Sequence, residues 1–129
     1  MKKLLSIIFV LVAMGLTNVW AYDFSAVAPS GQTLYYNIVD GNAEVTYPNA
    51  SAYYRSERWS GYSRPTGDLV IPESVTYNGS IYSVKSIGDY VFQDCTGLTS
   101  VTIGNSVTTI GGSAFAESYG LTSVTIPNS

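Results

Sequence analysis

Hydrophobic and polar positions in the C-terminal half of the chain repeat with a period of 23 residues. The segment Leu98–Ile103 recurs unchanged as Leu121–Ile126, and residues around it also match, for example Phe92 and Phe115. Within each segment, valine and isoleucine alternate with serine and threonine. This alternation predicts a short strand with its apolar side chains inward and its hydroxyls outward. A fixed period of this kind predicts a solenoid, in which similar coils stack on one another.

The remainder of each period carries signals for sharp turns. Gly111 and Gly112 allow the backbone to bend, and Gly120 permits the turn into the next strand. Ala114 and Phe115 are predicted to begin a short helical or 3-10 turn, with the ring filling the space between coils. We therefore expect a β-rich solenoid whose short strands are joined by short helical turns.

A partial earlier copy of the period begins at Asp68. Leu69–Pro72 matches Val101–Gly104, but nine extra residues centred on Asn78-Gly79 separate the two halves of this copy. Asn-Gly between β-forming residues is a strong signal for a two-residue hairpin. Residues 68–129 are therefore assigned to the repeats, the first with a hairpin insertion and the last incomplete.

The period is absent before Asp68. Thr33–Val39 and Ala43–Tyr47 flank a turn sequence, Asp40-Gly41-Asn42, and predict a second hairpin. An end coil would expose its apolar face, so a solenoid needs a cap, and this hairpin is the predicted N-terminal cap. Residues 22–67 are assigned to the cap and to a connection rich in Tyr, Ser and Arg. The chain stops at Ser129 inside a repeat, and about three repeats are needed for a useful core, so the sequence is predicted to be truncated at its C-terminus.

Residues 1–21 have the pattern of a secretory signal peptide. Lys2 and Lys3 precede the apolar run Leu4–Leu16, and Val19–Ala21 provides a cleavage site. The apolar run is 13 residues long, whereas a membrane-spanning helix needs roughly 20. Removal of residues 1–21 leaves four basic and nine acidic residues, a net charge of −5. That charge argues against nucleic acid and anionic membranes as partners. We expect a secreted or cell-surface protein whose mature chain does not insert into the membrane.

The chain has no histidine and one cysteine, Cys95. This composition excludes most nucleophile–base pairs, most zinc sites and any internal disulfide. Cys95 matches Ser118 in the period and is predicted to be a small buried residue. Acid pairs such as Asp89 and Asp94 fit no catalytic motif. We therefore predict a non-enzymatic protein without catalytic residues, metal or cofactor.

The repeat also supports a family resemblance. Ser106–Phe115, followed by Gly120–Ser129, resembles the BspA-type leucine-rich repeat of bacterial surface proteins, and Asp68–Gly79 resembles the first repeat of that family. The resemblance covers about Asp68 to Ser129. One departure is Ser106, where many leucine-rich repeats place Asn or Cys, so a side-chain ladder at that position would be weaker here.

The resemblance implies a binding function outside the cell. It implies a module for protein–protein interaction or adhesion, with an extracellular protein of a host matrix or a partner cell as ligand. The alternative is a structural spacer that presents a further C-terminal domain.

Two groups of residues are candidates for ligand binding. The first is the outward-facing strand positions, because solenoids usually bind on their concave face; the alternative is a merely solvated sheet face. The second is an aromatic and cationic stretch, because exposed aromatics beside arginine form interface hot spots or stack on sugars; the alternative is that some rings fold back over the cap. The strand positions are Asp68, Val70, Ser100, Thr102, Ser123 and Thr125, with the two serines and two threonines predicted to contact the ligand. The second stretch contributes Trp59, Tyr62 and Arg58 as predicted contacts, with Tyr53, Tyr54, Arg55 and Arg64 beside them.

Overall fold

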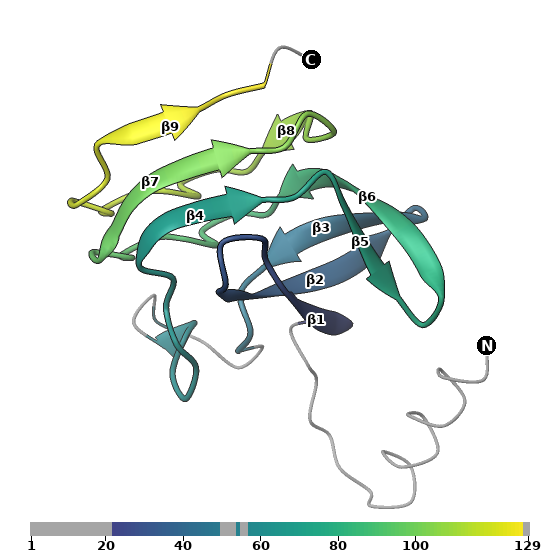
Figure 1. The fold of residues 1–129 in the computed structure, drawn as a ribbon. Coiled ribbons are helices and arrows are strands. Elements are labelled where there is room, and N and C mark those ends of the chain that lie inside the picture. The colour runs from purple at the N-terminus through teal and green to yellow at the C-terminus, as the bar shows by residue number, and fades with distance from the viewer. Residues whose placement is uncertain (1–21, 50–53, 55–56, 128–129) are drawn as a thin grey trace, which may run out of the picture.

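The chain folds into two β-sheets, here described from a computed structural model (Figure 1). The structure describes residues 22–49, 54 and 57–127, so the predicted signal segment 1–21 lies outside the described residues. One sheet is parallel, with strand order β4-β7-β9; the other has the order β1-β2-β3-β6-β5, with β8 also paired to β6. The strands are β1 Phe24–Val27, β2 Thr33–Val39, β3 Asn42–Thr46, β4 Gly67–Ile71, β5 Ser74–Tyr77, β6 Ser80–Ile87, β7 Leu98–Ile103, β8 Thr109–Ile110 and β9 Ser123–Thr125.

The described residues form almost no helix, and none of their helices has the length and hydrophobicity needed to span a membrane. The fold is therefore strand-rich, as predicted.

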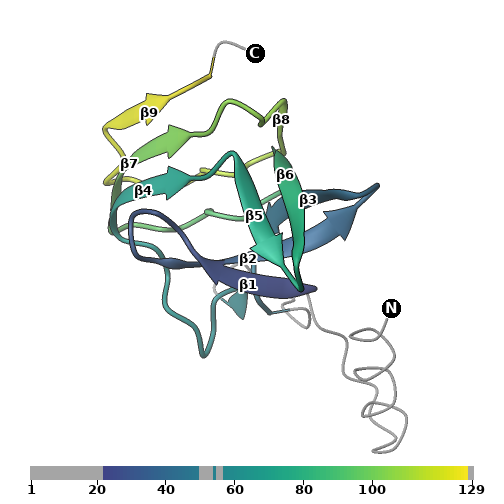
Figure 2. The same cartoon turned by 45° about the vertical axis from the view of Figure 1, so that its right-hand side comes forward.

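The 23-residue period sets the register of the parallel sheet. Val101 of β7 pairs with Val124 of β9 on one side and with Leu69 of β4 on the other. Successive coils therefore stack with equivalent residues adjacent, and Figure 2 shows β4, β7 and β9 lying one above another. The inward-facing residues Leu69 and Ile71 are fully buried, because the alternation along each strand places them between the two sheets.

The segments that face away from the parallel sheet are hydrogen-bonded turns, which corrects the predicted short helical turns. Their backbone is interrupted at fixed intervals by residues with positive φ, a conformation incompatible with a right-handed helix. These residues are Tyr90 and Asp94 in one coil, with φ of 63° and 65°, and Ser113 and Glu117 in the next, with φ of 55° and 59°. Amide groups from this segment bond across to the next coil instead of along a helix, for example Phe92 N to Ala114 O at 2.7 Å and Asp94 N to Ala116 O at 2.8 Å.

Both predicted hairpins are present, and both have two-residue turns. Val39 pairs with Asn42 around Asp40-Gly41, and Tyr77 pairs with Ser80 around Asn78-Gly79. All four turn residues have positive φ, as a type I′ turn requires. The first hairpin, β2–β3, continues the second sheet because β3 pairs in parallel with β6. Strand β1, which pairs antiparallel with β2, was not predicted.

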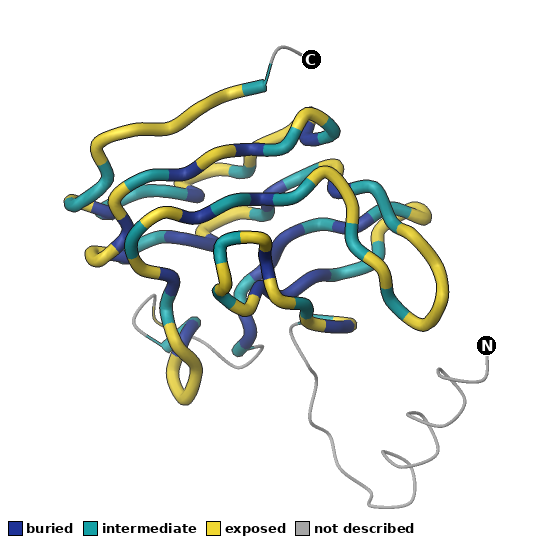
Figure 3. The backbone as a smooth tube through the Cα atoms, in the orientation of Figure 1, coloured by how far each residue is buried: buried dark blue, intermediate teal, exposed yellow. Residues whose placement is uncertain are grey.

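Side chains of the loop between β1 and β2 form hydrogen bonds with backbone groups at the outer edge of β4. Ser30 Oγ accepts a hydrogen bond from Val70 N at 2.9 Å. Gln32 Nε2 donates to Thr66 O at 2.7 Å and to Asp68 O at 3.2 Å. An uncovered strand edge would leave such backbone groups open to pairing with another chain. At the opposite side of the sheet, β9 is exposed along its length (Figure 3).

A row of aromatic rings joins the connection to the repeats. The Phe92 and Phe115 rings of successive coils stack with centroids 5.4 Å apart. Trp59 stacks on the other side of Phe92 at 6.4 Å, although it belongs to no repeat, and its Nε1 donates to Val91 O at 2.9 Å. Trp59 is 2% exposed. It thus occupies the place that the phenylalanine of a preceding coil would take.

Glycines lie where the backbones of successive coils approach most closely. A Cβ atom built on Gly111 would come within 2.5 Å of both Asp89 N and Asp89 Oδ1. The neighbouring Gly112 is different, because a Cβ there would meet only Asp89 Oδ1, at 3.7 Å. The backbone N–H of Gly112 donates to that same oxygen at 2.6 Å. Gly111 is therefore required by the spacing between coils, and Gly112 is not.

The position of Trp59 predicts that its substitution lowers the stability of the fold. We expect Trp59→Ala to reduce the free energy of unfolding by about 3–5 kcal/mol, the usual cost of removing a large buried ring. Trp59→Phe keeps the stack but loses the bond to Val91, and we expect a loss nearer 1 kcal/mol from that bond. Urea denaturation measures both, with Tyr119→Ala as the control because Tyr119 is 79% exposed. A Trp59→Ala protein as stable as the unsubstituted chain would contradict this role.

The two adjacent glycines give a second, matched prediction. Gly111→Ala forces the coils apart, and we expect it to lower the free energy of unfolding by about 1–3 kcal/mol. Gly112→Ala meets no close atom, and we expect a change within about 1 kcal/mol, in either direction. Thermal and urea unfolding of the two variants side by side provide the measurement. If both variants lost the same free energy of unfolding, the close contact between Gly111 and Asp89 would not set the spacing between coils.

Candidate functional site

Two rows of outward-facing side chains cross the parallel sheet; we call them the outer rows. The first consists of Asp68, Ser100 and Ser123, and the second of Val70, Thr102 and Thr125. Each row contains residues paired in register on β4, β7 and β9. The structure therefore brings together all six strand positions selected from the sequence.

The outer rows differ in how firmly their side chains are held. Asp68 Oδ1 accepts hydrogen bonds from Ser100 Oγ at 2.7 Å and from Thr99 Oγ1 at 3.4 Å. Ser100 is half-buried, whereas Thr102, Ser123 and Thr125 are exposed. The rows thus present hydroxyl groups on hydrogen-bonded strands, and Asp68 is their one charged member. Such a surface can donate and accept hydrogen bonds to a bound chain.

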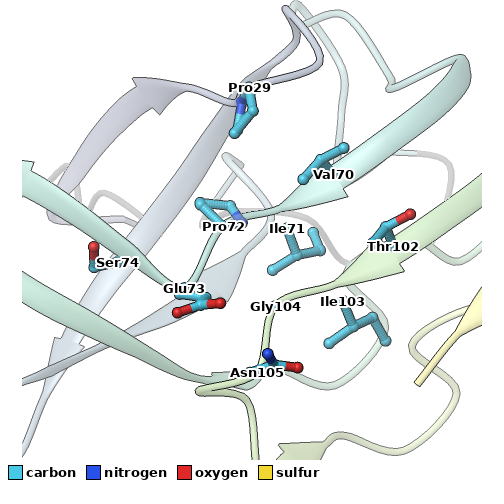
Figure 4. Close-up of a pocket in the computed structure, with 10 residues that line it drawn as sticks. All are labelled: Pro29, Val70, Ile71, Pro72, Glu73, Ser74, Thr102, Ile103, Gly104 and Asn105. Atoms are coloured by element: carbon cyan, nitrogen blue, oxygen red, sulfur yellow. The ribbon is translucent and has the colours of Figure 1, made fainter. Parts of the chain in front are cut away.

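A pocket of about 480 Å³ lies at the carboxyl ends of β4 and β7, next to the second outer row (Figure 4). Its apolar lining comes from three separate segments of the chain. Glu73 and Asn105 contribute polar groups at one end of it, and Pro29 and Val70 lie toward the other. The full lining is Pro29, Val70, Ile71, Pro72, Glu73, Ser74, Thr102, Ile103, Gly104 and Asn105.

This pocket was not anticipated from the sequence, apart from its two outer-row members. The positions of Pro72 and Glu73 could have indicated a pocket, since these residues lie where β4 ends and the insertion begins. Nothing in the sequence indicated that Pro29 lines the pocket, because the loop before β2 is far from β4 in the chain. Only the packing of that loop against β4 brings its proline to the pocket.

The second predicted group does not form one exposed patch, and the structure corrects the expected exposure of Trp59. Trp59 is buried in the aromatic row, so its indole contacts protein rather than solvent. Tyr62 is 41% exposed, and its ring makes a T-shaped contact with Tyr35 at a centroid distance of 5.4 Å. The positions of Trp59 and Tyr62 agree with the alternative, in which some rings fold back over the N-terminal segment. Tyr54 is exposed, and Tyr53 and Arg55 lie outside the described residues.

Arg58 is also held by protein contacts. Its guanidinium carbon lies 4.6 Å from the centroid of the Tyr90 ring and 5.4 Å from that of Tyr47. Arg58 Nη1 donates to Gln93 Oε1 at 2.7 Å. These contacts place Arg58 on the turn side of the repeats, apart from the outer rows on the strand side. Arg58 therefore ties the connection to the first complete coil.

Cys95 is buried, as predicted, and burial raises the pKa of its thiol to about 12. A thiol with such a pKa is neutral and weakly nucleophilic near pH 7. Among the described residues, no group of three or more Cys, Asp or Glu side chains could hold a metal ion. One oxygen of Asp89 is bonded to the Gly112 amide, a structural contact.

Comparisons with known proteins agree with this architecture. Residues 70–129 match a family model described as "BspA type Leucine rich repeat region (6 copies)". No curated protein sequence matches the chain significantly.

Three solved structures are similar to the chain. A leucine-rich repeat protein from Bacteroides ovatus is 28% identical with a TM-score of 0.62, over 83% of this chain and 24% of that one. A leucine rich cell surface protein from Faecalibacterium prausnitzii is 30% identical with a TM-score of 0.53, over 82% and 24%. A leucine-rich repeat protein from Bacteroides capillosus is 30% identical with a TM-score of 0.55, over 81% and 67%. The chain spans about a quarter of the first two and two thirds of the third. The repeat, the fold and these matches together show that the chain belongs to the BspA-type leucine-rich repeat family.

Proposed function

We propose that the chain is a non-enzymatic module that binds an extracellular protein, in interaction or adhesion, through the outer rows of the β4-β7-β9 sheet. The observation that carries the proposal is the alignment of hydroxyl side chains in register on β7 and β9, with Asp68 and Val70 in the same rows on β4, beside a pocket. A surface already ordered by the sheet loses little conformational entropy when a partner binds. The family supports this reading, since leucine-rich repeats commonly serve protein interaction.

We propose a secreted or cell-surface location for the protein. The signal pattern of residues 1–21 and the similarity to a leucine rich cell surface protein support it. In a bacterial host, the exported chain is expected to begin at Tyr22, because signal peptidase would cleave after Ala21. N-terminal sequencing of the exported protein checks this, and a retained leader would contradict it.

We further propose that the repeats form a solenoid and that residues 22–67 cap its first coil. The bonds from Ser30 and Gln32 to the edge of β4, and the stacking of Trp59 on Phe92, support the cap. At β9, the inward-facing Val124 and the adjoining Ile126 are 37% and 58% exposed. Their exposure leaves an apolar surface at the β9 edge of the described stack.

A substitution in the middle of the outer rows tests the binding function. Thr102→Lys places a long charged side chain on the exposed face, and we expect it to weaken partner binding at least about tenfold, as at an interface hot spot. Thr109→Lys is the matched control, because Thr109 is an exposed threonine on a strand of the other sheet. Binding to a panel of immobilised extracellular matrix proteins is measured by surface plasmon resonance.

The same experiment separates binding from the spacer alternative. Loss of a specific interaction in Thr102→Lys, with binding retained in Thr109→Lys and melting temperatures unchanged in both, supports the outer rows. Equal effects of the two substitutions would place the binding surface elsewhere. The absence of any specific partner would favour a structural spacer.

A further inference from the structure

The pocket beside the outer rows carries a single charged group, the carboxylate of Glu73. The backbone holds this residue in place from two sides. Glu73 O accepts a hydrogen bond from Val84 N at 2.9 Å. On the other side Gly104 lies so close that a Cβ there would be 2.8 Å from Glu73 N. The Glu73 side chain is exposed, and the described part of the chain places no basic side chain in an ion pair with it.

The rest of the pocket is suited to an aliphatic chain. Val70 and Pro72 are half-buried and Pro29 is exposed, so their apolar atoms remain open to a ligand, and Ile71 and Ile103 are buried beneath them. Asn105 and Thr102 add further hydrogen-bonding groups. A ligand that complements this lining has an extended hydrocarbon part and a charged hydrogen-bond donor at its end. The side chains of arginine and lysine have this construction.

The distribution of charge favours a cation at this face. The charged residues of the outer rows and the pocket are Asp68 and Glu73, both acidic. Of the three described basic residues, Arg58 lies against the turn side, Arg64 lies near the buried Cys95, and Lys85 lies on β6 of the other sheet. The chain as a whole has a net charge of −3. A positively charged segment is therefore attracted toward the outer rows, and an anionic one is repelled.

The hairpin insertion makes the pocket particular to the first repeat. Ser74, which lines one wall, is the first residue of β5, and β5–β6 is the hairpin around Asn78-Gly79. The following repeat runs from Gly104 to Thr109 without such a hairpin. The hairpin thus adds a wall to the open pocket at the first repeat, against which a side chain can lie.

We propose that this pocket binds an arginine or lysine side chain of the partner protein, with its aliphatic part against Pro72 and Val70 and its charge at Glu73. This inference rests on the proposed binding function and gives it a ligand class, a basic extended segment that crosses the outer rows.

Binding of a small probe tests the pocket without knowledge of the partner. The isotope-labelled exported chain is titrated with N-acetyl-arginine methylamide and, separately, with N-acetyl-citrulline methylamide, which is similar in shape but uncharged. We expect the arginine probe to shift the amide resonances of Ile71, Glu73 and Asn105 in a saturable way, and to bind about tenfold more tightly than the citrulline probe, because a charge-assisted hydrogen bond is lost in the latter.

Two isosteric substitutions test which carboxylate binds the arginine probe. Glu73→Gln is expected to reduce the affinity for the arginine probe about tenfold, for the same reason. Glu44→Gln removes an equal charge from a second pocket, lined by Glu44, Thr46, Asp89 and Thr109 among others, and is expected to leave the affinity unchanged. Equal binding of both probes to the unsubstituted chain, full affinity in Glu73→Gln, or shifts centred on Glu44 and Asp89 would each overturn the proposal.

The outcomes also separate this inference from the proposed function. A pocket that fails to bind the arginine probe, in a chain that still loses its protein partner on Thr102→Lys, refutes the pocket alone. Specific probe binding in a chain with no protein partner refutes the proposed function and leaves the basic-side-chain site standing. The probe comparison on the unsubstituted chain requires no variant, so it decides the question even if Glu73→Gln fails to fold.

Discussion

The close approach of one coil's backbone to the next is the contact on which the rest of the structure depends. At Gly104, Gly111 and Gly120, a Cβ atom would lie within 2.8 Å of backbone atoms in the neighbouring coil. This spacing lets Tyr90, Phe92 and Asp94 bond across coils on the turn side while the strands pair on the other. Because both sides are bonded, the strands cannot slip in register. The outer rows are ordered for this reason, and their hydroxyls need no other support.

At the outer edge of β4, side chains from the N-terminal region contact the strand where no further strand pairs with it. Ser30 and Gln32 bond to the backbone of β4, and Trp59 covers the ring of Phe92. These residues lie in separate segments of the N-terminal region, and none belongs to the repeat. Polar side chains replace the hydrogen bonds that a preceding strand would make, while an indole replaces the packing of a preceding phenylalanine.

The features that could be predicted from the sequence are those that depend on local chemistry or on the period. Asn78-Gly79 and Asp40-Gly41 specify their turns through the residues' own tolerance of positive φ. The period of 23 residues predicted that Ser100 and Ser123 would lie side by side, since residues one period apart occupy equivalent positions in adjacent coils. The turns at Tyr90 and Ser113 escaped prediction, because the positive φ falls on residues with no intrinsic preference for it. The burial of Trp59 and the arrival of Pro29 at the pocket depend on contacts distant in sequence, for which a single chain offers no signal.

The hairpin β5–β6 leaves the stack after β4 and rejoins it at the end of β6, where Val84 and Ile87 are buried and the strand pairs with β3 and β8. The parallel sheet and the turn side are built from residues outside the hairpin, yet the hairpin supplies one wall of the pocket. The tip of the hairpin, residues 78–81, is exposed and lies apart from these buried positions. Because Tyr77 and Tyr82 contact Phe24, changes of length and sequence at little cost to stability are expected at that tip, which makes it a natural site for evolutionary diversification and for the design of new binders.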